Sequence, residues 1–494
     1  MYKETLSKDL LKLEQVGSFT QILAKRTVGI GSAVIFLGIV WIAVRGLTAG
    51  VDNATFIIVA GVIGGYMALN IGANDVANNV GPAVGAKSLT LGGALIIAAV
   101  FESAGAYLAG GDVVKTISKG IVDPAGIADS TIFIWTMMSA LLAAALWINL
   151  ATYLGAPVST THSIVGGVGG AAVAAAGFTV VNWGVMAKIA ASWVISPVLG
   201  GIVAALFLWF IKVQVIYQPD KIAGAKRWIP ILVAVMAGAF STYLVMKGLK
   251  KIWRPEPWVP IAIGAAMFAL TWAVVRPWVR NKAEGMENRN KSIRELFHLP
   301  LICAAALLSF AHGANDVANA VGPLAAIVDT VTTGGIASKV EIPNWVLFVG
   351  GAGISMGLLL FGPKLIRTVG EQITRLNPMR AYCVALSAAI TVIIASSLGL
   401  PVSSTHIAVG AVFGVGFLRE YITARKTHIN HGKIPKSPET SSEWERLDTA
   451  EKTQRRRLVR RQHLWTIIAA WLITVPCSAV LAAVIFHVAV RLFN

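Results

Sequence analysis

Long apolar runs separated by short polar segments dominate the chain, and they predict membrane-spanning helices. The clearest runs are Val28–Val44, Ile132–Leu154, Val185–Ile211, Ile229–Met246, Trp345–Phe361 and Leu464–Val490. Each run is long enough to cross the roughly 30 Å hydrocarbon core of a bilayer as a helix. Shorter or glycine-interrupted runs surround four polar strings, so about 12 crossings are expected. The pattern predicts an all-α polytopic membrane protein whose helices are broken or re-entrant at the polar strings.

Two of these polar strings are repeats of the other two. Residues Gly72–Asn78 and Gly313–Asn319 both read Gly-Ala-Asn-Asp-Val-Ala-Asn, and Val-Gly-Pro closely follows each copy. The second string, Pro157–His162, reads Pro-Val-Ser-Thr-Thr-His and returns as Pro401–His406 with one serine in place of a threonine. The copies are offset by 241 (313 − 72) and 244 (401 − 157) residues. The order and spacing predict two halves that derive from one unit.

The charges of the connecting segments predict that the two halves are inverted. Basic residues before the first apolar run place the N-terminus in the cytoplasm, and the run into the first string then starts outside. The connector 276–295 carries six lysines and arginines, so the run into the second string starts inside. Inverted repeats with polar strings at helix breaks are typical of secondary transporters, which bind substrate at the repeat interface.

These features divide the chain into six expected parts and place it in the cell (inner) membrane. We expect 1–54 to hold a cytoplasmic N-terminal segment and an additional first transmembrane helix, 55–227 the first repeat, 228–297 connecting helices and a basic cytoplasmic loop, 298–418 the second repeat, 419–463 a hydrophilic cytoplasmic loop, and 464–494 a C-terminal transmembrane helix. The loop 419–463 mixes arginines with glutamates and reads as a solvated linker.

Composition supports the membrane assignment and excludes other classes. The 494 residues are 56% hydrophobic and 13% charged, about half the charged fraction of a soluble protein. The net charge of +18 comes from lysines and arginines between the apolar runs, so no nucleic-acid partner is expected. The cysteines Cys303, Cys383 and Cys477 lie inside apolar runs and predict neither a disulfide nor a zinc framework. The polar first 26 residues do not read as a cleavable signal peptide.

The two Pro-Val-Ser strings have the composition of an anion site. A proline suits the first turn of a new helix, where unpaired backbone amides and hydroxyl groups bind anions. We expect an oxyanion to be held by neutral donors, namely Ser159, Thr160, Thr161, Ser403, Ser404 and Thr405. The alternative is that these residues are ordinary helix caps. The neighbouring His162 and His406 could carry a proton, contact the anion or be buried polar groups.

The two Asn-Asp strings have the composition of a cation site. Their candidate ligands are Asn74, Asp75, Asn78, Asn315, Asp316 and Asn319. The preceding glycine permits a helix break that turns backbone carbonyls inward, and oxygen ligands of this kind suit a hard cation such as sodium. A proton on Asp75 or Asp316 is the competing interpretation, since burial favours protonation of a carboxylate. Hydrogen bonding between helices is the third.

Two further residues break the symmetry between the halves. Glu102 lies in a largely apolar stretch, where a carboxylate is a functional candidate, and sequence alignment of the halves places Gly350 opposite it. His312 precedes the second Asn-Asp string, whereas Ile71 precedes the first. Glu102 and His312 are therefore candidates for an asymmetric ion or proton site, and the alternative for Glu102 is a role in the interface.

Taken together, the four strings resemble the inorganic phosphate transporter (PiT) family. Similarity also extends through Phe101–Ser103, Lys119–Asp123 and Ala395–Gly399, and it covers the chain from about Phe56 to Gly416. The resemblance implies a symporter, and not an enzyme, that imports phosphate with sodium or protons, needs no cofactor and is a homodimer in the lipid bilayer. It implies phosphate binding at the Ser and Thr residues of the Pro-Val-Ser strings and ion binding at Asn74, Asp75, Asn315 and Asp316. The Asn-Asp motif is that of the sodium-coupled branch, but Ala385 stands where those members carry a second glutamate.

Three alternatives stay open at this point. A sulfate permease of the same fold is the nearest, because neutral donors do not distinguish two tetrahedral anions, although only phosphate can donate a proton to Asp75 or Asp316. A membrane metalloenzyme using His162, His406 and Asp75 lacks the usual metal-ligand spacing. A passive anion channel would need basic residues along its pore, and the apolar runs hold almost none beyond Lys188.

Overall fold

The computed structural model consists of helices and the short segments that connect them, and it holds no strand among the residues that it describes, which are 27–123, 126–127, 129–156, 158–248, 255–336, 341–368, 376–429 and 462–493. The predicted N-terminal segment 1–26 and most of the predicted loop 419–463 lie outside these ranges. Eleven of the described helices are long and apolar enough to cross a membrane, close to the dozen expected.

The helices follow the apolar runs of the sequence. They are Thr27–Leu47, α2 (Ala54–Gly85), α3 (Leu91–Ala109), α4 (Gly111–Lys115), η1 (Thr116–Gly120), α5 (Ser130–Leu154), α6 (Thr160–Ala176), η3 (Phe178–Val180), α7 (Trp183–Ile211), η4 (Lys212–Ile216), α8 (Lys221–Tyr243), η5 (Leu244–Gly248), α9 (Trp258–Lys282), α10 (Asn290–Leu296), α11 (His298–Asp316), α12 (Ala318–Thr333), α13 (Asn344–Thr368), α14 (Pro378–Ser397), α15 (Ser404–Ile429) and α18 (Gln462–Phe493).

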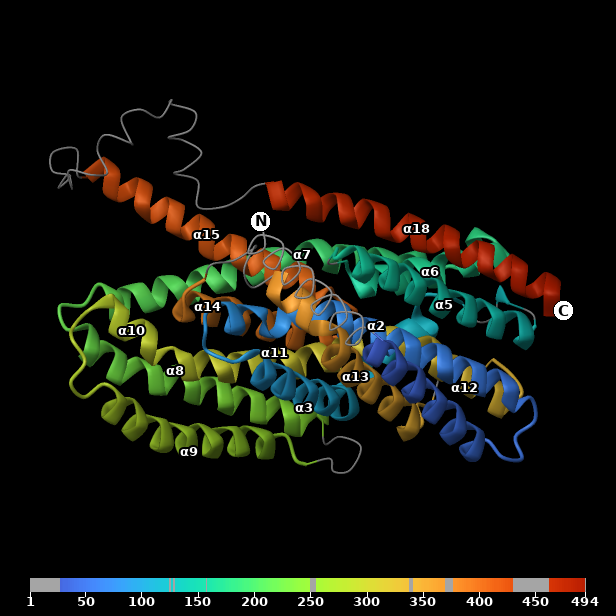
Figure 1. Ribbon diagram of the computed structural model, residues 1–494, viewed down its shortest axis with the longest axis horizontal. Helices are drawn as coiled ribbons and strands as arrows, with labels where there is room; N and C mark the ends of the chain where they lie inside the picture. The colour runs from blue at the N-terminus through green and yellow to red at the C-terminus, as the bar shows by residue number, and fades with distance from the viewer. Residues whose placement is uncertain are drawn as a thin grey trace, which may run out of the picture.

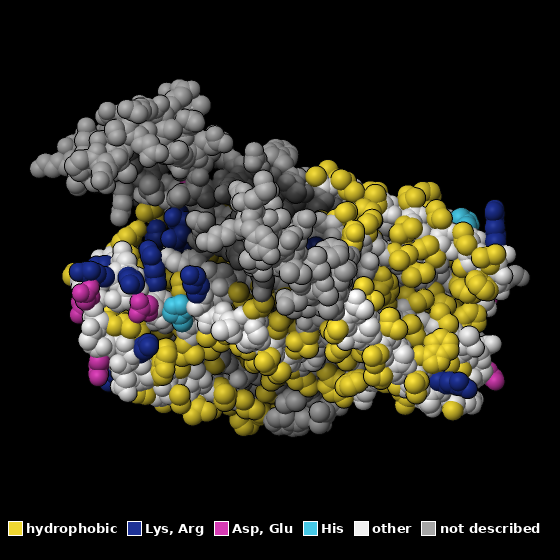
Figure 2. Space-filling model, viewed as in Figure 1, with side chains coloured by type: hydrophobic (Ala, Val, Ile, Leu, Met, Phe, Trp, Pro, Cys, Tyr) yellow, Lys and Arg dark blue, Asp and Glu magenta, His cyan; other side chains and the backbone are white. Residues whose placement is uncertain are grey.

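The surface has the distribution of side chains that a bilayer requires. Figure 2 shows hydrophobic side chains over the middle of the molecule and lysines and arginines gathered at one end, beside α8 and α10. Helices at the periphery expose large apolar residues, such as Ile42 on the first helix, Ile261 on α9 and Leu472 on α18. These side chains face lipid because only an apolar surface is stable there.

Two hairpins enter the molecule from opposite ends and meet at its centre. Figure 1 shows α5 and α6 toward the right and α14 and α15 toward the left. Each hairpin turns at a Pro-Val-Ser string, just after a glycine with positive φ, Gly155 at 74° and Gly399 at 70°. Glycine suits these turns because it reaches the left-handed region without steric cost. The expected re-entrant geometry therefore occurs at the Pro-Val-Ser strings.

The Asn-Asp strings differ from the prediction in their local structure. The first copy lies within the uninterrupted helix α2, so the expected break after its glycine is wrong. In the second copy α11 passes into α12 at Val317, whose φ of −56° and ψ of −31° are still helical. Prolines, and not the glycines, free backbone carbonyls in these helices. Pro82 and Pro323 lie inside the helices and have no N–H. The carbonyls four residues earlier, on Asn78 and Asn319, therefore lack their usual helical donor.

The helices of the two halves cross-pack in a symmetric way that corrects one sequence alignment. Gly72 lies against the Ile354 carbonyl as Gly313 lies against the Glu102 carbonyl, and Gly357 meets Leu69 as Gly105 meets Phe310. The pairs share offsets of 241 (313 − 72, 310 − 69) and 252 (354 − 102, 357 − 105). The counterpart of Glu102 is therefore Ile354 and not Gly350.

Candidate functional site

The two Pro-Val-Ser turns and the two Asn-Asp strings converge on one buried site. Asn78 of α2 donates to Thr405 at 2.8 Å, and Asn319 of α12 donates to Thr160 and Thr161 at 3.2 Å each. Thr161 donates in turn to the Val402 carbonyl of the opposite hairpin at 3.0 Å. Each Asn-Asp helix thus binds the hairpin of the other half, as expected for inverted repeats meeting at an interface.

Asp75 lies where these contacts join. Its two carboxylate oxygens accept from the hydroxyls of Thr160 at 2.9 Å and Thr405 at 3.1 Å, one from each hairpin. Two chains of hydrogen bonds therefore end on this carboxylate, one running from Asn319 through Thr160 and the other from Asn78 through Thr405. Asp75 itself is 1% exposed.

Asp316 has the corresponding position in the second half but fewer partners. Its Oδ2 accepts from Ser404 at 3.3 Å, while its Oδ1 has no hydrogen-bond donor among the described residues. The amide oxygen of Asn319 likewise has no donor in that part of the chain. Buried oxygens that can only accept need a donor or a cation. This donor set, carboxylate and amide oxygens, fits a hard cation such as sodium.

Asn74 and Asn315 have a different set of contacts from the other motif residues. Asn74 donates to Thr152 (2.9 Å) and the Ala156 carbonyl (3.3 Å) and accepts from the Val158 amide (3.3 Å). Asn315 repeats the pattern with Ser396, Leu400 and Val402 at 2.9, 3.1 and 3.2 Å. Both amides therefore hold the turn that carries the anion-binding residues of their own half.

The predicted asymmetric pair Glu102 and His312 lies directly beside Asp75 and Asp316. His312 Nδ1 is 3.2 Å from Glu102, and His312 Nε2 is 3.1 Å from Asp316 and 3.7 Å from Asp75. None of these three contacts meets the geometry of a hydrogen bond, so the interaction is electrostatic. Ligand atoms of Asp75, His312 and Asp316 all lie within 4.8 Å of one another. Asn79 donates to the other Glu102 oxygen at 2.8 Å.

The serines and histidines of the Pro-Val-Ser strings support the helix starts. Ser159 accepts from the His162 amide at 3.1 Å and Ser403 from the His406 amide at 3.3 Å, so both serines are N-caps. The two imidazole rings lie 4.8 Å apart, and Trp193 of α7 stacks on His162. Trp193 also donates to the Pro401 carbonyl at 3.2 Å. This arrangement leaves the first backbone N–H groups of α6 and α15 without intrahelical acceptors, as at every helix start.

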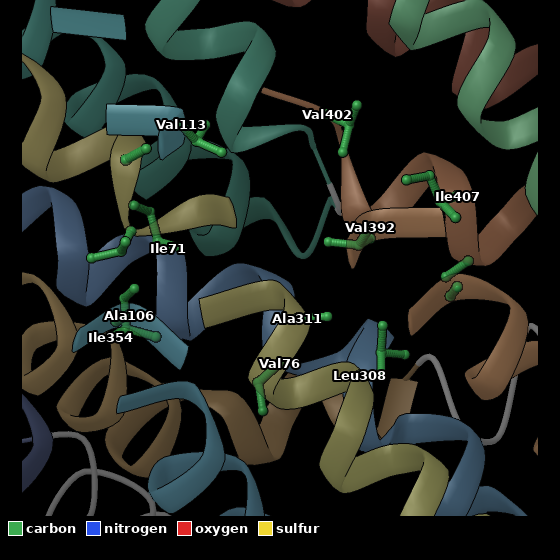
Figure 3. Close-up of a cluster of buried hydrophobic side chains, with 14 of the residues drawn as sticks. Ile71, Val76, Ala106, Val113, Leu308, Ala311, Ile354, Val392, Val402 and Ile407 are labelled. Atoms are coloured by element: carbon green, nitrogen blue, oxygen red, sulfur yellow. The ribbon is translucent and has the colours of Figure 1, made fainter. Parts of the chain in front are cut away.

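Apolar side chains enclose the polar site. Figure 3 shows Ile71 and Val76 of α2, Leu308 of α11 and Val402 among the buried hydrophobic side chains of this region. Their exposed fractions are 0 to 1%. Exclusion of water strengthens the interactions of the carboxylates with any bound ion, because the local dielectric constant is low.

Sequence reasoning missed several members of the site. Asn79 is the clearest, and a signal for it existed, because the second string has Ala320 at that position. Thr152, Ser396 and Trp193 lie outside the strings, and nothing in their spacing indicated contact with the motifs. All twelve predicted phosphate- and ion-binding residues lie at or next to the convergence of the hairpins, together with Glu102 and His312.

Comparison with known proteins agrees with this geometry. A model of the "Phosphate transporter family" matches residues 71–482. The chain belongs to this phosphate transporter family. It is 44% identical to the "Putative phosphate permease" of Helicobacter pylori J99, over 97% of this chain and 98% of that one. A protein of the same name in Chlamydia trachomatis is 35% identical over 88% of this chain and 99% of its own length.

A solved structure is similar to this chain in fold as well as in sequence. "The sodium-dependent phosphate transporter" superposes with a TM-score of 0.78 at 36% identity, covering 89% of this chain and 100% of its own. The predicted family resemblance and the all-helical multi-pass fold are therefore confirmed. Membership in a transporter family also rules out the metalloenzyme alternative.

Proposed function

We propose that this phosphate transporter family member is a symporter that imports inorganic phosphate together with sodium across the cell membrane. The observation that carries the proposal is the double use of Thr160 and Thr405. Both hydroxyls donate to Asp75, and both belong to the strings predicted to bind the anion.

This shared use gives a physical route for coupling. Without a cation, the Asp75 carboxylate holds the protons of both hydroxyls, which are then poor donors to an anion. A sodium ion that binds the Asp75 oxygens competes for their lone pairs, so Thr160 and Thr405 are released to donate to phosphate. Each ligand thereby raises the affinity of the other, and the coupling is reciprocal.

The remaining donors and acceptors divide in the same way. Backbone amides at the starts of α6 and α15, which lack intrahelical acceptors, supply neutral donors for a phosphate oxyanion. Ser404 and Thr161 add hydroxyl donors when they leave Asp316 and the Val402 carbonyl. Asp316 Oδ1 and the amide oxygen of Asn319, which have no donor among the described residues, supply acceptors for the cation. Asn74 and Asn315 position the two turns and need not contact either ion.

Sodium is proposed ahead of the proton because acceptor oxygens without donors suit a metal cation. Ala385, which stands where the sodium-coupled branch carries a second glutamate, lies fully buried in α14. Its methyl group supplies no ligand, so the chain has one fewer carboxylate there than the sodium-coupled branch that it resembles. We propose that Asp75 and Asp316 provide the cation site without it.

Topology and assembly complete the proposal. The basic end of the molecule in Figure 2 is assigned to the cytoplasm, together with the N-terminus. A homodimer is proposed from the family resemblance.

Uptake into proteoliposomes tests the function. Purified protein is reconstituted, sodium and pH gradients are imposed separately, and radiolabelled phosphate is followed with sulfate as competitor. Uptake driven by sodium alone and insensitive to equimolar sulfate is expected. Uptake driven only by the pH gradient would replace sodium by the proton, and strong inhibition by sulfate would favour a sulfate permease.

A further inference from the structure

Lys119 and Asp329 form a buried ion pair away from the binding site. The ammonium and carboxylate are 3.1 Å apart, and their side chains are 7% and 6% exposed. A buried pair contributes little net stability, because desolvation offsets most of the attraction, whereas removing one partner is costly. Such a pair is therefore well suited to hold two helices together in one of two conformations of a protein.

The two residues belong to elements that both lead to the binding site. Asp329 lies on α12, 13 residues beyond Asp316, which corresponds to roughly 20 Å along a helix. Lys119 lies on the π-helix η1, whose first residue, Thr116, donates to the Gly399 carbonyl at 2.7 Å. Short π-helices are rare and often occur at functional sites. A separation of Lys119 from Asp329 would therefore move the turn of the second Pro-Val-Ser string.

A cavity beside Lys119 leaves room for a second position of its side chain. It measures about 370 Å³ and is lined by Lys119, Val122, Asp123, Thr179, Val181 and Asn182. Asp123 offers an alternative carboxylate in this cavity, and Asn182 an alternative polar contact. The ammonium thus has a buried partner, Asp329, and polar groups on the open side, as a switch between closed and open states requires.

The position of the pair indicates which end of the pathway it closes. Figure 1 shows α12 at the end opposite α8 and α10, and Figure 2 shows the lysines and arginines at the α8 and α10 end. By the positive-inside rule, Asp329 lies toward the non-cytoplasmic side. Its counterpart in the first half, Ser88 (329 − 241), is uncharged and contacts His298. The two symmetric positions thus differ in charge and in partner.

We propose that the Lys119–Asp329 pair is the outer gate of the transporter, and that η1 couples its opening to the anion-binding turn at Gly399. This rests on the proposed transport function, because a gate presupposes alternating access to the central site. In the closed state Lys119 pairs with Asp329. In the outward-open state it turns to the cavity beside Asp123.

Labelling of a buried cysteine next to the gate tests this directly. Ser118 is 0% exposed and adjoins Lys119, so Ser118→Cys is introduced after Cys303, Cys383 and Cys477 are replaced by alanine. A membrane-impermeant maleimide is added to the outside of intact cells. Slow labelling is expected in this background, and Asp329→Asn should accelerate it by about tenfold or more, since the closed state loses its ion pair. Unchanged labelling would overturn the proposal.

Matched variants keep the test decisive. The charge swap Lys119→Asp with Asp329→Lys should restore slow labelling, and Asp329→Glu should label at an intermediate rate; these two decide the question if Asp329→Asn does not accumulate in the membrane. Glu287→Gln, which breaks the exposed pair with Arg289, should leave the rate unchanged. Acceleration by Glu287→Gln as well, or a swap that labels as fast as Asp329→Asn, would contradict a specific gate. Labelling requires neither sodium nor phosphate, so failure of the symport proposal would appear separately, as uptake without sodium dependence.

Discussion

Asp75 and Thr405 are 330 positions apart in the sequence, yet the threonine hydroxyl donates to the carboxylate at 3.1 Å. The contact joins the Asn-Asp string of one half to the Pro-Val-Ser string of the other. Thr160 of the first half donates to the same carboxylate, so a single buried aspartate accepts hydrogen bonds from both hairpins. The predicted cation and anion residues are therefore one hydrogen-bonded unit.

Replacing Asp75 by asparagine should abolish coupled uptake. The substitution keeps the size of the side chain but removes the charge and one acceptor, so a cation loses its strongest ligand and one hydroxyl loses its partner. We expect initial uptake to fall by about a hundredfold, the effect of roughly 3 kcal/mol. Asp52→Asn, in an exposed loop, is the matched control and should transport normally. Intact sodium-driven uptake in Asp75→Asn would contradict the proposed role.

The contacts of Asn74 and Asn319 predict distinct kinetic effects. Asn74→Ala removes three hydrogen bonds that hold the first turn, at about 1 kcal/mol each, and should raise the phosphate KM roughly tenfold or more. Asn319→Ala removes the amide oxygen proposed as a cation ligand, together with the hydrogen bonds to Thr160 and Thr161, and should raise the sodium concentration needed for half-maximal uptake. Uptake measured while sodium and phosphate are varied independently separates the two. If Asn74→Ala changed sodium dependence first and phosphate KM little, Asn74 would be an ion ligand, as the motif alone indicated.

The sequence was sufficient to predict the membrane fold and the family, because apolar length and repeated strings are local signals. The binding roles given to the twelve paired residues stay predictions. The sequence was insufficient for the Asn74 and Asn315 contacts, since spacing does not show which way an amide points. It also placed Gly350 instead of Ile354 opposite Glu102. These two positions differ by four residues, about one helical turn, and occupy the same face, so helical periodicity cannot distinguish them.

Close helix packing at Gly313 predicts a large loss of stability on substitution. A methyl group there would overlap the Glu102 backbone carbonyl, and backbone of a packed helix cannot move aside cheaply. Gly313→Ala should lower the free energy of unfolding by about 3 kcal/mol, the upper end for overpacking. Gly92→Ala is the control, since nothing lies within 4 Å of the added atom, and it should be neutral or stabilising. Thermal unfolding in detergent measures both; equal effects would show that the two helices can separate.

The Glu102 and His312 pair can be tested by copying the other half of the protein. Their symmetric positions hold Ile354 and Ile71, so Glu102→Ile with His312→Ile would give both halves the same apolar residues there. Each single substitution leaves a buried polar partner unmatched and should cost about 3 kcal/mol or more. The double variant should recover only part of that loss, because two apolar groups replace the pair while Asn79, Asp75 and Asp316 still lose a contact. Unfolding of all four proteins gives the coupling energy, and additive losses would show that the pair does not act as a unit. If the double variant folds and still transports phosphate with sodium, the asymmetric pair is not part of the coupling-ion site; if only its sodium dependence is lost, the pair supports that site.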